Sequence, residues 1–228
     1  MSKLFHLNEL YLFSNQFSSI PSFIYKMSQL KRLYFGNNLL EGNLDYWEFD
    51  NNLHYLDLSN NLLTGTIPSS IGNKPLTLLD LSKNRLSGTI PESIGNLIFL
   101  SNLKLSYNQL EGNIPESIGN LFKLEFLRLC NNKLGGTIPN SFKNLAQLSF
   151  LDISFNQFSG TVPELILSLT TLNTIIISHN HFSGVFPSPI NYLDVIKADS
   201  NEITGISNIC TENSVIEEID FSNNFIQT

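Results

Sequence analysis

The sequence has few cysteines, few charged residues and no long apolar run. Two cysteines in 228 residues are too few for a disulfide framework. No apolar stretch approaches the roughly 20 residues that a membrane-spanning helix requires. The residues after Met1 lack the apolar segment and cleavage site of a signal peptide. The 13 basic residues are outnumbered by 20 acidic ones, which argues against nucleic acid as the main partner, because phosphates are bound by basic side chains.

The sequence also lacks the signatures of catalysis and metal binding. It contains no GxxxxGK[ST], GxSxG or HExxH pattern and no kinase motif. His179 and His181 flank Asn180 without a third ligand at a suitable spacing, so we interpret them as surface histidines. Cys130 lies where most other repeats have serine, which indicates a small buried thiol; a reactive one would need a positive field, and Arg128 offers only a weak hint of it. We therefore expect no enzymatic activity, no cofactor and no metal.

What the sequence does contain is one template with a period of 23–24 residues. Its clearest copy spans residues 100–123 and fits LxxLxLxxNxLxGxIPxxIxxLxx. The copies start at Leu7, Leu30, Leu53, Leu76, Leu100, Leu124, Leu148, Leu172, Leu193 and Ile216, the last one truncated. The template covers residues 1–228, which predicts a single solenoid domain without polar caps. We expect the chain to be a fragment of a longer protein.

The template predicts an α/β solenoid that forms a right-handed superhelix. Alternation in LxxLxL is typical of a strand with leucines inward, and stacked strands give a parallel sheet on the concave face. Loops and short 3-10 turns are expected on the convex face, because a proline in each of the best-matching repeats excludes long helices. An asparagine at the ninth place can satisfy buried backbone groups at the turn after each strand. This predicted asparagine ladder comprises Asn15, Asn38, Asn61, Asn84, Asn108, Asn132, Asn156, Asn180, Asn201 and Asn224.

A glycine and an Ile-Pro pair complete the template. The glycines are expected in a backbone shape that a side chain would hinder; they are Gly65, Gly88, Gly112, Gly136, Gly160, Gly184 and Gly205. The LxGxIP pattern, closest between Leu53 and Thr171, is similar to the plant-type leucine-rich repeat of receptor-like kinases, receptor-like proteins and polygalacturonase inhibitors. The copies starting at Leu7, Leu30, Leu172 and Leu193 depart from it. The resemblance implies recognition of a partner by the concave face.

The outward residues of the predicted strands are not dictated by the fold, and they form columns because parallel strands stack in register. Aromatic side chains gather near the first end, at Tyr11, Tyr34 and Tyr55. A basic and aromatic cluster falls in the middle and comprises Lys104, Tyr107, Phe126, Arg128, Phe150 and Phe155. Exposed aromatic and arginine side chains are typical of interface anchors, so we predict partner binding there. The alternative is that they only pack against neighbouring strands.

Residues 152–228 hold nine acidic residues and the single base Lys197, so this end either binds a basic partner or is a solvated face. Three functions remain open. The first is a receptor-like module that binds a protein or peptide, the second an inhibitor of a secreted polysaccharide-degrading enzyme, and the third an intracellular scaffold or repeat segment of a larger signalling protein. The resemblance favours an extracellular location. The absence of any Asn-x-Ser/Thr glycosylation site leaves a cytosolic one open.

Overall fold

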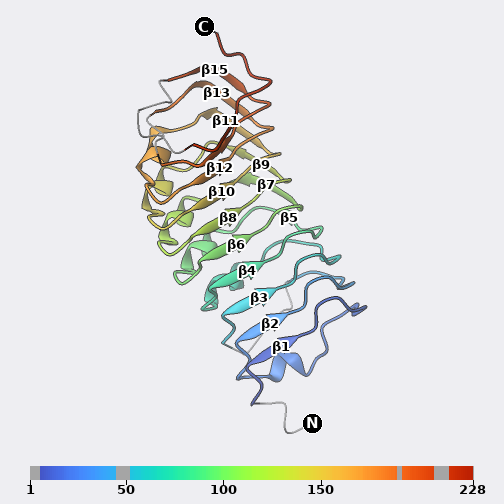
Figure 1. Ribbon diagram of the computed structural model, residues 1–228. Helices are drawn as coiled ribbons and strands as arrows, with labels where there is room; N and C mark the ends of the chain where they lie inside the picture. Colours follow the sequence, from blue (N-terminus) through green and yellow to red (C-terminus); the bar gives the residue numbers. More distant parts are fainter. Residues whose placement is uncertain (1–5, 45–51, 189–191, 208–215, 228) are drawn as a thin grey trace.

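A computed structural model describes residues 6–44, 52–188, 192–207 and 216–227. The chain winds into an elongated, curved solenoid with its two ends at opposite poles (Figure 1). One parallel sheet of ten short strands follows the solenoid from end to end. Its strands are β1 (Glu9–Tyr11), β2 (Arg32–Tyr34), β3 (Tyr55–Asp57), β4 (Leu78–Asp80), β6 (Asn102–Lys104), β8 (Phe126–Arg128), β10 (Phe150–Asp152), β12 (Thr174–Ile176), β14 (Val195–Lys197) and β16 (Glu218–Asp220).

The strands of this sheet pair in the register that the template predicts. Phe126 of β8 lies opposite Phe150 of β10, and Arg128 lies opposite Asp152, which are 24 residues apart. The interval shortens to 21 residues between Thr174 and Val195, because that repeat is shorter. Equivalent positions are therefore neighbours along the whole sheet, and the leucine-rich-repeat solenoid predicted from the sequence is confirmed.

The hydrophobic core is continuous from repeat to repeat. The middle residues of the interior strands, such as Leu103, Leu127 and Leu151, have no exposed surface. The aliphatic residue before the template proline is buried on the opposite side of the coil, as at Ile90 and Ile114. Each coil therefore buries its apolar side chains only against its own turn and the two neighbouring coils.

A second parallel sheet, which the sequence did not predict, follows the asparagine turn (Figure 1). Its six strands are β5 (Ser87–Gly88), β7 (Gln109–Asn113), β9 (Lys133–Gly136), β11 (Gln157–Thr161), β13 (His181–Phe186) and β15 (Glu202–Ile206). The template glycine lies in or beside these strands. Six of the seven expected glycines have φ between +71° and +79°, whereas Gly205 is not in the left-handed region.

The convex side is built from short 3-10 turns. They are η2 (Ile24–Lys26), η3 (Ser69–Asn73), η4 (Glu92–Asn96), η5 (Glu116–Asn120), η6 (Asn140–Asn144) and η7 (Glu164–Ser168). Successive turns approach so closely that a Cβ atom on Gly95 would lie 2.4 Å from the carbonyl oxygen of Ser117. The neighbouring backbone therefore favours glycine at Gly72, Gly95 and Gly119, whereas Lys143 occupies the equivalent place in η6. Among the described residues, no helix has the length and apolar character needed to span a membrane.

Candidate recognition surface

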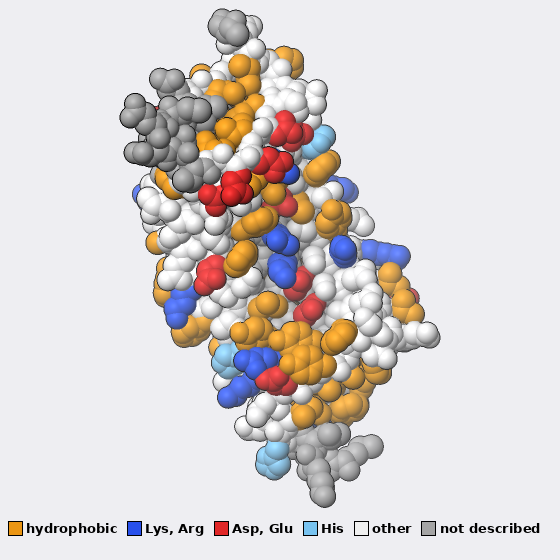
Figure 2. Space-filling view, viewed as in Figure 1, with side chains coloured by type: hydrophobic (Ala, Val, Ile, Leu, Met, Phe, Trp, Pro, Cys, Tyr) orange, Lys and Arg blue, Asp and Glu red, His pale blue; other side chains and the backbone are white. Residues whose placement is uncertain are grey.

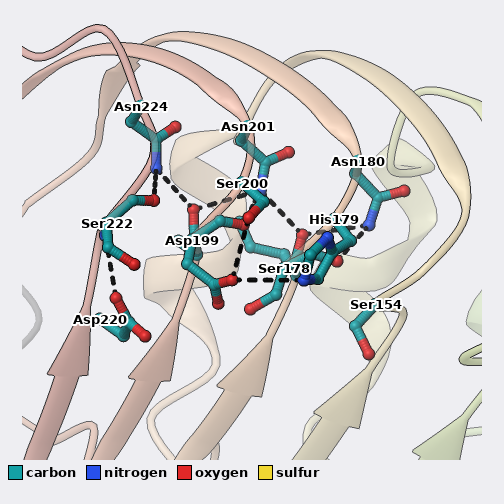
Figure 3. Close-up of polar contacts among 12 residues, drawn as sticks. Ser154, Ser178, His179, Asn180, Asp199, Ser200, Asn201, Asp220, Ser222 and Asn224 are labelled. Carbon is teal, nitrogen blue, oxygen red and sulfur yellow. Dashed lines mark hydrogen bonds and ion pairs between the residues drawn. The ribbon is translucent and has the colours of Figure 1, made fainter.

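The ladder asparagines lie just beyond the ends of the concave strands and bridge consecutive repeats. The Asn132 side-chain amide donates to the carbonyl oxygens of Leu129 in its own repeat and Leu105 in the preceding one, both at 3.0 Å. Its Oδ1 accepts the backbone N–H of Leu110, also at 3.0 Å. The same arrangement recurs at Asn38, Asn61, Asn84, Asn108, Asn156, Asn180, Asn201 and Asn224. Figure 3 shows three consecutive members near the C-terminal end.

Asn15 differs because no earlier ladder carbonyl lies within its reach in the described chain. Its side-chain amide donates only to Leu12 and Phe13 of its own repeat, at 3.2 Å each. Asn15 is exposed, whereas Asn156 is buried. The ladder thus has a weakly held first member and strongly held interior members.

The residue before each ladder asparagine adopts a left-handed backbone conformation in all ten repeats, with φ between +52° and +58°. These residues are Ser14, Asn37, Asn60, Lys83, Tyr107, Asn131, Phe155, His179, Ser200 and Asn223. Asparagine is suited to this conformation, but a bulky side chain in it is strained by about 1–3 kcal/mol. This conformation is not predicted by the repeat template, although the recurring asparagine at the eighth place is a signal for it in the sequence.

A hydrogen bond between an aspartate and the serine two residues later recurs at the ends of four strands of the concave face. The carboxylates of Asp57, Asp80 and Asp152 accept the backbone N–H and hydroxyl of the serine two residues later. At Asp220 the backbone N–H of Ser222 holds the pKa of the carboxyl below its usual value. These aspartates are therefore committed to the strand ends.

Where another residue replaces the aspartate, the serine hydroxyl two residues later lacks a carboxylate as its hydrogen-bond acceptor. Ile176 stands in the aspartate position of its repeat, and the Ser178 hydroxyl is buried without a hydrogen bond. Lys104 stands there in another, where the buried Ser106 hydroxyl lies beside the thiol of Cys130 in the next repeat.

The aromatic cluster at the first end is internally paired. Tyr11 and Tyr34 stack with ring centroids 4.7 Å apart, and the Tyr11 hydroxyl donates to Glu9 at 2.6 Å. Arg32 forms an ion pair with Glu9, and its guanidinium lies 4.8 Å from the centroid of the Tyr55 ring. The hydrogen bond from Tyr11 and the positive charge of Arg32 lower the pKa of Glu9. Glu9, Arg32 and the Tyr11 hydroxyl thus already have partners inside the protein.

The structure divides the predicted middle cluster into two parts. Phe126, Arg128 and Phe150 form the first, which we call the floor cluster. The Arg128 guanidinium stacks 4.6 Å from the centroid of the Phe150 ring, and the rings of Phe126 and Phe150 are 6.3 Å apart. Lys104, on the neighbouring strand, forms an ion pair with Asp80 at 3.4 Å. Figure 2 shows Lys and Arg side chains near the middle of the face that it presents.

Arg128 is the exception among the basic residues that project from the concave strands. Arg32, Lys104 and Lys197 all form ion pairs, the last with Glu218 at 2.9 Å. Arg128 is exposed and has no carboxylate partner within the described chain. Asp152 lies opposite Arg128 in the sheet, but its Oδ1 atom accepts the two Ser154 bonds. The guanidinium donors therefore point to solvent.

Tyr107 and Phe155 belong to the second part, which we call the rim row. They occupy the left-handed position beyond the strand ends, and about half of each side chain is exposed. The Phe155 ring stacks on His179 at 4.1 Å, and Lys83 lies 5.9 Å from the centroid of Tyr107. None of the ring contacts of the described residues joins this row to the floor cluster.

The acidic end of the concave face is largely paired within the protein. Lys197 bonds Glu218, and Asp199 lies 3.5 Å from His179 (Figure 3). His181 lies beside Glu202 at 3.3 Å. In the described part of the chain, no group of three histidine, cysteine or acidic residues could hold a metal ion. Cys130 is buried and free, and burial raises the pKa of its thiol; Cys210 lies outside the described residues.

The second sheet and the residues that flank its strands carry two rows of mostly small residues. One row is Thr64, Ser87, Glu111, Gly135, Ser159 and Ser183, and the other is Thr66, Thr89, Asn113, Thr137, Thr161 and Val185. The methyl groups of Thr66, Thr89, Thr137 and Thr161 each lie over the glycine of the following repeat. This surface is regular, and its hydroxyl and methyl groups repeat with the coil spacing.

Comparison with known proteins defines the class of this protein. The sequence profile of the leucine-rich repeat matches residues 52–74, 75–97, 99–121, 123–145, 147–169 and 171–193. The chain therefore belongs to the leucine-rich repeat family. No curated protein sequence matches it.

Solved structures of plant receptors have the same fold at recognisable sequence identity. The ectodomain of the Arabidopsis receptor kinase HAESA, in complex with a peptide hormone, is 35% identical with a TM-score of 0.87, over 96% of this chain and 38% of that one. The PEPR1–AtPEP1 complex is 34% identical with a TM-score of 0.87, over 94% and 31%. A plant ice-binding protein is 27% identical with a TM-score of 0.73, over 96% and 73%. The chain thus spans less than half of either receptor ectodomain.

Proposed function

We propose that the chain is a recognition module that binds a protein or peptide along its concave face, with the floor cluster as the main contact. The similarity to peptide-hormone receptor ectodomains supports a peptide ligand and an extracellular location. The observation that carries the proposal is the state of Arg128. Its guanidinium lies over the ring of Phe150, 4.6 Å from the ring centroid, yet no carboxylate in the described chain forms an ion pair with it.

An arginine in this state is preorganised to bind a ligand. Stacking restricts the side chain, so less conformational entropy is lost on binding. The planar donors are suited to an acidic side chain or another carboxylate of the ligand, and the rings of Phe126 and Phe150 offer apolar area next to it. The cluster at Tyr11, Tyr34 and Tyr55 is a secondary contact, because its charged groups are already paired.

The test begins with a linear peptide selected from a random display library on the immobilised chain. Its affinity is then measured for the wild type and for Arg128→Ala, Phe150→Ala and Arg85→Ala. Arg85 is an exposed arginine that lies outside the concave sheet and serves as the matched control. We expect the first two changes to cost more than about 1 kcal/mol of binding free energy, roughly a fivefold loss, and the control to cost nothing. Equal affinities for all four proteins would refute the proposal.

Inhibition of a polysaccharide-degrading enzyme is a variant of the same proposal, with a protein in place of a peptide. Inhibition of polygalacturonase by the wild type that disappears in Arg128→Ala would support it. A chain that binds the selected peptide but leaves the enzyme fully active would favour the receptor-like function.

The rows of threonine and serine on the second sheet favour one other candidate, adsorption to ice, because a plant ice-binding protein is similar to this chain. Thr89 and Thr137 are exposed in the same row, two repeats apart. If the face adsorbs to ice, the chain inhibits ice recrystallisation and the double change Thr89→Lys and Thr137→Lys abolishes this activity. Thr174→Lys on the concave sheet is the control and should retain it. Absence of activity in the wild type would eliminate this candidate.

A further inference from the structure

The rim row combines unfavourable backbone conformation with exposed aromatic rings. Asparagine, which suits the left-handed conformation, occupies this position in four repeats, whereas Tyr107 and Phe155 are bulky residues in the same conformation. Neither ring is part of the buried core, and about half of each is accessible to solvent. The fold gains little from these two side chains, and a strained position of this kind points to a role in binding.

The spacing of the two rings along the solenoid is defined by backbone hydrogen bonds. The N–H of Tyr107 donates to Cys130 at 2.9 Å, and the N–H of Asn131 donates to Ser154 at 3.0 Å, so the strand ladder continues through the rim position. Tyr107 and Phe155 are separated by two such steps, or about 9.6 Å at the usual strand spacing. The residue between them is Asn131, which is smaller and half-buried.

This spacing matches a particular peptide conformation. A polyproline II helix has three residues per turn and a rise of about 3.1 Å per residue, so equivalent side chains recur about every 9.3 Å. Aromatic-lined surfaces are the usual binding sites for proline-rich segments, which are already ordered before they bind and so lose little entropy. We propose that Tyr107 and Phe155 bind a ligand segment in the polyproline II conformation, with prolines three residues apart lying on the two rings.

The polar groups of the row are consistent with such an occupant. A polyproline II segment has no internal hydrogen bonds, so its carbonyl oxygens need donors. The Tyr107 hydroxyl has no hydrogen-bond partner within the described chain and can donate to one of them. Lys83 lies beyond Tyr107 and forms no ion pair with any described residue, which favours an acidic residue of the ligand at that end. At the other end His179 stacks on Phe155 and supports the ring.

This inference rests on the proposed function, since the rim row borders the concave face and the segment would be part of the same peptide ligand. It concerns different side chains from the floor cluster, so the two can be tested apart. The probe is a fluorescein-labelled decaproline peptide, measured by fluorescence anisotropy. A labelled Gly-Ser peptide of equal length is the conformational control.

The variants are Tyr107→Asn, Phe155→Asn and Phe122→Asn. Asparagine is the residue that other repeats carry at the rim position, so the first two changes preserve the fold, and Tyr107→Asn should not lower the melting temperature. Phe122 is an exposed phenylalanine on the convex side and is the matched control. We expect decaproline to bind the wild type, each rim variant to bind it at least tenfold more weakly, and the Phe122 variant to bind within twofold of the wild type.

The outcomes separate this inference from the proposed function. Arg128→Ala should weaken the selected peptide while leaving decaproline within twofold, which supports two distinct contacts. If the wild type does not bind decaproline, or if both rim variants bind it as tightly as the wild type does, the inference is overturned even if Arg128 proves essential for the selected peptide. Binding of cellohexaose that is lost in the rim variants, without binding of decaproline, would also overturn it and would assign the row to a polysaccharide.

Discussion

Asn156 lies in the middle of the ladder, and its replacement by alanine tests how the solenoid is held together. The side-chain amide of Asn156 donates to the carbonyl oxygens of Leu129, Ile153 and Ser154, and its Oδ1 accepts the backbone N–H of Leu134 at 3.0 Å. The change Asn156→Ala removes all four bonds from a buried side chain.

The groups that lose these bonds are not equally affected. The Leu129 and Ile153 carbonyl oxygens keep bonds from Asn132 and Asn180, and the Ser154 carbonyl keeps one from the backbone N–H of Asn131. The buried N–H of Leu134 has only the Asn156 oxygen. A buried N–H without a partner costs about 1–3 kcal/mol, and the three weakened carbonyls add to it, so we expect a loss of about 2–4 kcal/mol.

Urea unfolding followed by circular dichroism measures this loss, and an unchanged m-value would show that the same surface is exposed. Asn15→Ala is the matched control. Asn15 is exposed and bonds only its own repeat, so its replacement should cost less than about 1 kcal/mol. Similar losses for the two variants, or a loss below about 1 kcal/mol for Asn156→Ala, would refute this account of the ladder.

Asn156→Asp sharpens the test because it retains the acceptor for Leu134 and replaces the donor by an oxygen that faces three carbonyls. Burial and these carbonyls should raise the folded-state pKa of the new carboxyl above its unfolded value of about 3.9. The variant should therefore be least stable near neutral pH and regain stability as the pH falls toward 4. A difference from the wild type that does not change with pH would contradict this reasoning.

Three other predictions concern the convex turns, the acidic end and the free thiol. Gly95→Ala should lower the free energy of unfolding by about 1–3 kcal/mol in urea titration, because its Cβ would meet the Ser117 carbonyl at 2.4 Å. Asp220, whose pKa is lowered by a backbone N–H, should contribute stability that is present above the unfolded pKa of about 3.9 and lost as the pH falls further; in Asp220→Asn that part of the acid titration should disappear. In a Cys210→Ser background, Cys130 should react with iodoacetamide at least about tenfold more slowly in the folded protein than in urea, since burial raises its pKa.

Controls for these predictions come from the same chain. Gly205→Ala should be nearly neutral, because its Cβ would meet Val185 at an ordinary 3.4 Å. Equal costs at Gly95 and Gly205 would refute the packing argument. A wild-type acid transition unchanged by Asp220→Asn would argue against its lowered pKa, and rapid alkylation of folded Cys130 would show that the thiol is accessible.

The main sheet could be predicted because its signal is repeated ten times and depends on short-range rules. Alternating leucines define which side chains point inward, and one asparagine per repeat marks where each strand ends. The columns at Phe126 and Arg128 follow from the constant period, which makes equivalent residues neighbours.

Other features depend on contacts that the template does not encode. The register places Asp152 opposite Arg128, which suggests an ion pair, but Asp152 bonds Ser154 and the guanidinium stacks on Phe150. Tyr107 and Phe155 were assigned to the same cluster as Phe126, because their left-handed backbone, which turns them onto the rim, is not visible in the residue types. The second sheet was missed because its strands are short and interrupted by glycine, and their pairing depends on the exact path of the turn.

The ladder also makes the two ends of the solenoid different in the hydrogen bonds that are lost when a terminal coil detaches. Each interior asparagine reaches back, so the buried N–H of one coil is capped by the coil that follows it. When the C-terminal coil detaches, its asparagine Oδ1 leaves with it, and the ladder N–H of the preceding coil loses its hydrogen bond. When the N-terminal coil detaches, the ladder N–H of the next coil keeps its hydrogen bond to the asparagine that follows. Removal of a coil from the C-terminal side should therefore leave a ladder N–H unbonded in the coil that becomes terminal, whereas removal from the N-terminal side breaks the bonds that N–H groups such as that of Gln109 donate to the preceding coil.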